Sequence, residues 1–152
     1  PSKRWKIEKL AALLDKIEAA GMEVVVTGSL QDKKLLESLK QLSKTHFIDA
    51  VSQTGVLQLA CLIKRCDVYI TSDSAPLHIA YAMKTPVVAL FGPTDPRRHT
   101  ILNAKQIIIN RRNLSCSPCY RRRCNKHTCM EEISVEGVFA AVKMLLGGHL
   151  QK

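Results

Sequence analysis

The chain has 152 residues, 46% of them hydrophobic, which is enough to bury one full core, so we expect one domain with a loop appended to it. The sequence contains no run of about 18 apolar residues and opens with no signal-peptide pattern, which argues against a membrane-spanning helix and predicts a cytoplasmic protein. Its formal net charge of +10 favours anionic partners such as phosphorylated ligands, lipid headgroups or nucleic acid.

Hydrophobic spacing predicts helices that alternate with short strands along most of the chain. Apolar residues recur at helical spacing in four segments, and short apolar runs separate these segments. The predicted helices cover residues 5–20, 31–43, 55–65 and 75–83. The predicted strands are MEVVVTG, HFIDAV, DVYIT, TPVVALFG and KQIIIN. Strict alternation of this kind is typical of a layered α/β fold with a parallel sheet.

The pattern changes after Asn110 into a basic, cysteine-rich loop at residues 111–130, and a closing helix is expected at residues 134–146. The arginines of this loop form most simply a solvated basic face, which could also approach a phosphorylated acceptor at a membrane. They are Arg111, Arg112, Arg121, Arg122 and Arg123.

Four of the six cysteines lie in this loop, at Cys116, Cys119, Cys124 and Cys129. Four thiolates at these spacings could bind a tetrahedral zinc ion, and His127 is a fifth candidate ligand. Zinc sites made of four cysteines usually contain two separated Cys-x-x-Cys pairs, whereas this loop contains one. Free or packed thiols, and disulfides formed on handling, therefore stay open as alternatives.

A polar segment, residues 71–74, lies between a predicted strand and Pro76, which suits the first turn of a helix. In open parallel sheets, ligands bind beyond the carboxyl ends of strands, where helix N-termini present free N–H groups. Ser74 or Asp73 could simply cap the helix. Capping uses only one or two of the free donors, so the remaining amides of the first turn could bind an anion.

The run SDSAPLHIAYAMKTPVVALFGPTDP, residues 72–96, resembles the donor-site signature of glycosyltransferase family 9, the ADP-heptose:lipopolysaccharide heptosyltransferases. The family's usual form is Asp-Ser/Thr-Gly-x-x-His, followed by Thr-Pro and then Gly-Pro-Thr-Asp-Pro. The segments KRW, TGSLQDKK, CSPC and CMEEISVEGV are similar to further parts of the family pattern. The resemblance covers essentially residues 1–152 and implies a nucleotide-sugar-binding, Rossmann-like three-layer domain with a mostly parallel sheet, the carboxyl-terminal half of a GT-B enzyme.

The resemblance implies inverting transfer of heptose from ADP-heptose to the lipopolysaccharide inner core, without a required cofactor. Lys3 would contact phosphate, Asp32 would accept the ribose hydroxyls, and Thr94 with Asp95 would face the sugar or the domain cleft. The diphosphate and sugar loop would consist of Asp73, Ser74, Ala75, Leu77 and His78. Purely structural roles stay open for three of these sites. Asp32 could be a surface aspartate, His78 a packing histidine, and Thr-Asp-Pro a common turn. Ala75 stands where the family has glycine, and its methyl group is expected to crowd the diphosphate.

In the family, a carboxylate of the amino-terminal half is the general base, and a strand ending in Pro-Gly-Ala precedes the Lys-x-Trp segment. We therefore expect a donor-binding fragment without its amino-terminal acceptor domain, which does not turn over alone. The expected partners are ADP-heptose or a related nucleotide sugar, that amino-terminal domain, and a phosphorylated lipid A core acceptor at the inner membrane face. The protein would then be cytoplasmic and peripheral to the inner membrane.

Two alternatives stay open at this point. One is a glycosyltransferase that uses another nucleotide sugar. The other is a basic, cysteine-rich nucleic-acid-binding module, which the net charge of +10 and a zinc loop would suit. The chain has one tryptophan, three tyrosines and three phenylalanines, and they form no array for base stacking, which makes nucleic acid the less favoured partner.

Overall fold

The computed structural model describes residues 2–101, 105–111 and 114–147, and its elements alternate as predicted. The strands are β1 (Val25–Gly28), β2 (Ile48–Val51), β3 (Tyr69–Ser72), β4 (Val87–Phe91) and β5 (Gln106–Asn110). The helices are α1 (Ile7–Ala19), α2 (Lys33–Leu42), α3 (Val56–Arg65), α4 (Ala75–Met83), α5 (Thr128–Glu131) and α6 (Val135–Gly147). Two 3-10 turns, η1 (Leu30–Asp32) and η2 (Pro96–Arg98), follow β1 and β4. The short helix α5 begins inside the segment predicted as loop, residues 111–130, and ends one residue beyond it.

The paired strands run parallel, as predicted, but their hydrogen bonds divide them into two parts. One part is β1–β2, with Val25 opposite Ile48, and the other has the order β3–β4–β5, with Val87 opposite both Tyr69 and Gln106. In the described residues β1 and β3 share no ladder. Instead, the hydroxyls of Thr27 and Tyr69 lie 3.0 Å apart and join the two parts through side chains.

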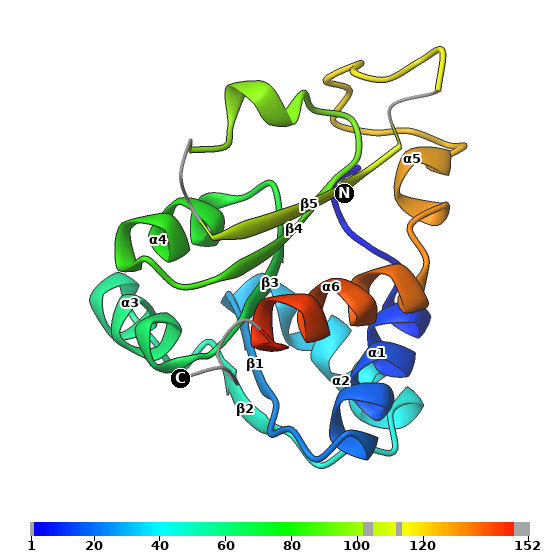
Figure 1. Ribbon diagram of the computed structural model, residues 1–152. Helices are drawn as coiled ribbons and strands as arrows, with labels where there is room; N and C mark the ends of the chain where they lie inside the picture. The colour runs from blue at the N-terminus through cyan, green and yellow to red at the C-terminus, as the bar shows by residue number, and fades with distance from the viewer. Residues whose placement is uncertain (1, 102–104, 112–113, 148–152) are drawn as a thin grey trace.

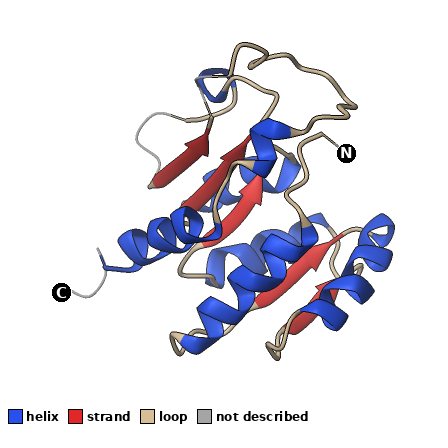
Figure 2. Cartoon of the chain, turned by 90° about the vertical axis from the view of Figure 1, so that its right-hand side faces the viewer, coloured by secondary structure: helices blue, strands red, loops and turns tan. Residues whose placement is uncertain are grey.

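Strand β4 lies at the centre of the core because its apolar residues are buried on both faces. Val88 and Leu90 pack with α1 and α6, whereas Val87, Ala89 and Phe91 pack with α3 and α4. The helices thus cover both faces of the strands, and the three-layer arrangement is confirmed (Figures 1 and 2). Within the described residues, no helix combines the length and apolar character that a membrane crossing needs.

The segment before α1 is held against the turn between α5 and α6. The indole N–H of Trp5 donates to the Ile133 carbonyl at 3.2 Å, and its ring packs on the core beside α1 and α6. Lys9 donates to the same carbonyl at 2.8 Å. These contacts fix residues 2–4 at the carboxyl edge of the strands, near the loops that follow β3 and β4 (Figure 1).

Candidate functional site

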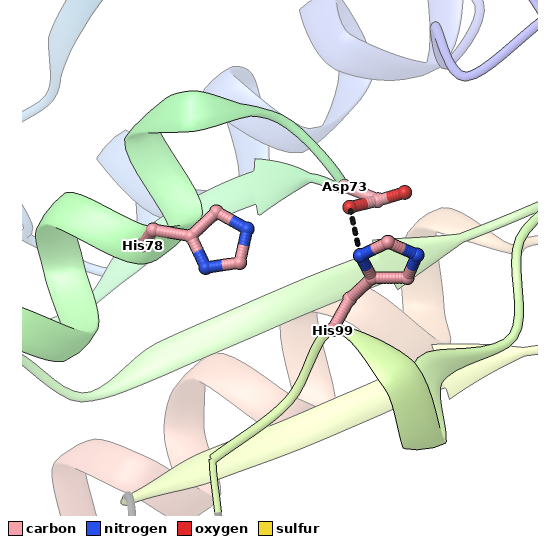
Figure 3. A group of neighbouring side chains, drawn as sticks. All are labelled: Asp73, His78 and His99. Atoms are coloured by element: carbon pink, nitrogen blue, oxygen red, sulfur yellow. Dashed lines mark ion pairs between the residues drawn. The ribbon is translucent and has the colours of Figure 1, made fainter.

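A buried carboxylate, Asp73, lies at the centre of the site. It directly follows β3 and is only 5% exposed. The Lys3 ammonium donates to its Oδ2 at 2.5 Å, and Nδ1 of His99 lies 3.8 Å from its Oδ1 (Figure 3). Burial alone would raise the pKa of Asp73, but the Lys3 hydrogen bond, the nearby Thr94 hydroxyl and the charges of Lys3 and His99 outweigh it. The pKa therefore lies below its usual value.

Two imidazoles flank this carboxylate. His78 stands on α4, His99 follows η2, and their ring nitrogens lie with a carboxylate oxygen of Asp73 inside a group 4.8 Å across (Figure 3). One carboxylate and two imidazoles are donors that a transition metal accepts. However, the Lys3 ammonium already contacts the carboxylate, and a metal there would lie beside a fixed positive charge. The group is better suited to an anion than to a cation.

The N-terminus of α4 is open toward the group of Asp73, His78 and His99. Ser74 occupies the N-cap position, yet its hydroxyl donates to the Ser72 carbonyl at 3.1 Å and does not cap a helix N–H. The simple capping interpretation is thus not what the structure shows for Ser74. Uncapped first-turn amides and the positive end of the helix dipole favour an anion at this position.

Leu77 is held within the first turn of α4. Its N–H donates to the Ser74 carbonyl at 3.0 Å, and its side chain is fully buried in the core with α3 and β4. The helix itself already uses this N–H, so a part for Leu77 in the diphosphate loop stays a prediction. Ala75, in contrast, is exposed at the first position of α4, so its methyl group lies on the open side of the helix end.

Thr94 supplies an unpaired hydroxyl. It follows β4, is 6% exposed, and its Oγ1 is a buried polar atom without a hydrogen-bond partner in the described structure. The hydroxyl lies near the Asp73 carboxylate and helps to lower its pKa, but the two groups form no well-aligned hydrogen bond. A buried hydroxyl without a hydrogen-bond partner costs folding free energy, so its position suggests a ligand that supplies this partner.

Asp95 has a local role. Its carboxylate caps η2 by accepting from the Arg97 N–H at 3.0 Å, and it pairs with the Arg97 guanidinium at 2.7 Å. The hydrogen bonds from Arg97 lower the pKa of Asp95 to about 2. Both carboxylate oxygens of Asp95 accept hydrogen bonds from Arg97 within the turn. This arrangement favours the interpretation of a common turn over the predicted contact with the sugar.

Asp32 lies at the end of η1, beyond the other part of the sheet. Its Oδ2 accepts from the Ser29 N–H and hydroxyl at 2.9 and 2.7 Å, and its Oδ1 accepts from Arg4 at 2.6 Å. Burial would raise the pKa of Asp32, but the Ser29 bonds and the Arg4 charge lower it overall. Neighbouring residues Lys3 and Arg4 thus bind two carboxylates from the two parts of the sheet.

The cysteine-rich loop packs beside this site. The described cysteines are free thiols; Cys116 and Cys124 are exposed and Cys129 is buried. The ring of His127, the fifth candidate ligand, contacts the Ser2 carbonyl at 2.7 Å. Of the loop arginines, Arg111 pairs with Glu132 at 3.5 Å, Arg121, Arg122 and Arg123 are exposed, and Arg112 lies outside the described residues.

His99 and Arg4 were not predicted from the sequence. His99 follows an irregular turn, so neither helical nor strand spacing marks it. Arg4 lies in the quoted segment KRW, where a basic residue next to Lys3 could have been taken as a second phosphate contact or as a partner for an acid. The three-dimensional contact with Asp32, 28 residues away, decides between them.

Comparisons with known proteins identify the family of the chain. The sequence model of glycosyltransferase family 9 (heptosyltransferase) matches residues 1–130. Lipooligosaccharide heptosyltransferase 2 of Campylobacter jejuni subsp. jejuni serotype O:6 is 26% identical over 149 residues, which are 95% of this chain and 47% of that protein.

Two solved structures have the same fold. A family 9 glycosyl transferase from Veillonella parvula has 27% identity and a TM-score of 0.85, over 97% of this chain and 43% of that chain. The Escherichia coli ADP-heptose lps heptosyltransferase II has 27% identity and a TM-score of 0.84, over 99% of this chain and 44% of that chain. The chain spans about half the length of these relatives.

Proposed function

This chain belongs to glycosyltransferase family 9, and we propose that it binds the nucleotide-sugar donor of an inverting heptosyltransferase. The proposed donor is ADP-heptose and the proposed acceptor is the lipopolysaccharide inner core. The observation that carries this proposal is the arrangement of Lys3, Asp73, His78 and His99 at the uncapped N-terminus of α4.

The arrangement suits a diphosphate for physical reasons. A diphosphate carries concentrated negative charge, and the site offers one ammonium, two imidazoles and the positive end of a helix. Asp73 holds Lys3 in one orientation from a buried position, so the ammonium does not need to be ordered when the ligand binds. The unpaired Thr94 hydroxyl would complete its hydrogen bonding with a phosphate or sugar oxygen.

In the proposed reaction, an acceptor hydroxyl oxygen attacks the anomeric carbon of the donor. The new glycosidic bond forms as the bond to the diphosphate oxygen breaks, and ADP leaves with that electron pair. The hydroxyl proton passes to a base, for which we propose a carboxylate outside this chain. The contribution of this chain is to stabilise the charge that develops on the departing diphosphate.

We further propose that the protein acts in the cytoplasm at the inner membrane face. The acceptor is an anionic lipid, and the exposed guanidinium groups of Arg121, Arg122 and Arg123 lie in the loop next to the donor site. Basic side chains near a membrane surface are attracted to anionic headgroups. This attraction supports an approach of the loop to phosphorylated lipid A.

The proposal is tested by calorimetric titration of the chain with ADP, GDP and UDP at moderate salt. We expect saturable binding of ADP, with affinity at least about tenfold above that of GDP and UDP, and a loss of about tenfold or more in Lys3→Met. Lys64→Met, at the exposed end of α3, is the matched control because it removes one positive charge away from the site. Equal losses in both variants would show charge attraction only.

Two further titrations test the identity of the donor and the alternative of nucleic-acid binding. ADP-heptose is expected to bind more tightly than ADP and ADP-glucose, since Thr94 would meet the sugar side of the ligand. Single-stranded RNA is expected not to saturate the chain at moderate salt. Saturable RNA binding together with no ADP binding would overturn the proposed function.

A further inference from the structure

The cysteine loop, defined here as residues 114–129, is long for a segment with so little regular structure. In the described residues only its last two positions belong to a helix, α5. Irregular connections of this length usually serve a function or need an additional tie to stay ordered. The loop lies over the carboxyl ends of β4 and β5, beside the chain's N-terminal segment (Figure 1).

The loop is bonded to the strand end that carries Thr94. The Ser117 hydroxyl donates to the Gly92 carbonyl at 3.1 Å. The backbone N–H groups of Cys119 and Tyr120 both donate to the Pro93 carbonyl, at 3.0 and 2.8 Å. These bonds fix the two residues that directly precede Thr94, so the position of the Thr94 hydroxyl depends on the loop.

The same loop is bonded to the segment that carries Lys3. The Ser2 hydroxyl donates to the Arg121 carbonyl at 2.6 Å, and the His127 ring lies 2.7 Å from the Ser2 carbonyl. Ser2 is 5% exposed, so both contacts are shielded from water. The cysteine loop therefore links the two segments that place Lys3 and Thr94 at the donor site.

Cys129 is the anchored thiol of the loop. It is 8% exposed and packs in the core with α1, α6 and β4. A Cβ placed on Gly92 would lie 3.2 Å from its Sγ and 2.5 Å from Met130 Sδ, so this close contact requires glycine. Cys129 is therefore the fixed member of the four loop thiols.

Cys124 accepts a backbone hydrogen bond. Its Sγ accepts the His127 N–H at 3.4 Å, a bond of the type that backbone amides make to metal-bound sulfur. The exposed side chains of Arg121 and Lys126 belong to the same loop, and their positive charge would balance a negatively charged centre.

We propose that Cys116, Cys119, Cys124 and Cys129 bind one zinc ion and that this ion fastens the cysteine loop to the donor site. Zinc accepts four thiolates in a tetrahedron, and binding releases four thiol protons without any change of oxidation state. The resulting centre carries a net charge of about −2, which the exposed Arg121, Arg122, Arg123 and Lys126 offset.

Binding requires the loop to close. Among the described side chains, Asp73, His78 and His99 form the group of three whose ligand atoms lie within 4.8 Å of one another. The described loop cysteines form no such group, so their sulfurs must move closer together to bind zinc. Cys116 and Cys124 are exposed, and closure would bring them toward Cys119 and the anchored Cys129. His127 is not needed as a ligand, because its ring already holds Ser2.

The zinc site is tested by metal analysis of the chain purified without chelators. We expect about one zinc per chain, and loss of this zinc in Cys116→Ser and in Cys124→Ser. Cys61→Ser is the matched control, because Cys61 is also an exposed thiol but lies on α3 outside the loop. Cobalt in place of zinc should give the absorption of a tetrahedral thiolate complex.

Several outcomes would overturn the zinc site. They are a chain that binds neither zinc nor cobalt at micromolar concentrations, zinc that persists in both loop variants, or an iron–sulfur cluster on the four cysteines. Two disulfides among the loop cysteines in the freshly isolated protein would also overturn it. Each outcome is read without any measurement of nucleotide binding.

The link to the donor site rests on the proposed function and has its own readout. Chelation of the zinc is expected to weaken ADP binding severalfold, and re-addition of zinc to restore it, in the wild type and in Cys61→Ser alike. If ADP binds equally with and without zinc, the fastening role is wrong although the zinc site stands. If zinc binds and ADP does not, the proposed function fails and the zinc site stands.

Discussion

The two parts of the sheet hold the carboxylates of the candidate site in different ways. Beyond β3, Asp73 is 5% exposed and pairs with Lys3 at 2.5 Å. Beyond β1, Asp32 is 30% exposed and pairs with Arg4 at 2.6 Å. Opposite charges attract more strongly where water is excluded, so pairs of similar length differ in energy. The proposed diphosphate side is thus held in place before a ligand arrives, whereas the proposed ribose side stays adaptable.

The largest expected effect comes from replacing the two neighbouring cations in turn. Lys3→Met leaves the buried Asp73 without its partner, so we expect a loss of about 1–3 kcal/mol of unfolding free energy. Arg4→Met leaves a carboxylate that water can reach, and less than about 1 kcal/mol should be lost. Urea unfolding of both variants measures the difference. Equal losses would mean that the two pairs contribute alike.

The next effect concerns the buried hydroxyl of Thr94. Thr94→Val removes a polar atom without a partner, so stability should stay unchanged or rise by up to about 1 kcal/mol, while ADP-heptose affinity falls about three- to tenfold. Thr85→Val is the matched control, because the equally buried Thr85 hydroxyl donates to Ile63 at 3.0 Å. That change should cost about 1 kcal/mol and leave the affinity unchanged. A destabilised Thr94→Val would contradict the unpaired hydroxyl.

A pH series compares the two carboxylates directly. The pKa of each lies below that of an unfolded aspartate, about 3.9, so each ionised group stabilises the fold above that pH. The stabilisation is lost as pH falls through the lower folded pKa. Asp73→Asn should therefore flatten the acid decline of unfolding free energy more than Asp32→Asn does. The reverse order would show that exposure does not decide the contribution of each pair.

The smallest expected effect is at the end of α4. Ala75→Gly removes the exposed methyl where the diphosphate would approach, so ADP affinity should rise about two- to threefold, with a loss of up to about 1 kcal/mol in stability. Ala82→Gly, also exposed on α4, should lose stability without any gain in affinity. Unchanged affinity in Ala75→Gly would mean that the methyl does not crowd the ligand.

Much of the fold follows from local spacing in the sequence. The apolar run of β4 predicts a strand covered on both faces, and Pro76 predicts the start of α4, because both signals are contained within a few residues. The division of the sheet could not be predicted. Strand pairing depends on which distant segments meet, and the apolar runs of β1 and β3 carry no mark of their partners.

The location of candidate-site residues was predictable where backbone position decides it. Asp73 and Thr94 follow strands, and the carboxyl ends of parallel strands meet at one edge. The roles of Leu77 and Asp95 could not be read in the same way, because nearby backbone and side-chain groups compete for their polar atoms. His99 was beyond sequence reasoning since it reaches Asp73 from a turn 26 residues away.

Trp5 gives the donor site an internal reporter. It is the chain's single tryptophan, it stands two residues after Lys3, and its indole is bonded to the Ile133 carbonyl. Its fluorescence therefore senses the segment that joins the two parts of the sheet and the cysteine loop. The proposed binding of nucleotide, the proposed binding of zinc and the unfolding of the chain can all be followed by one unlabelled optical signal.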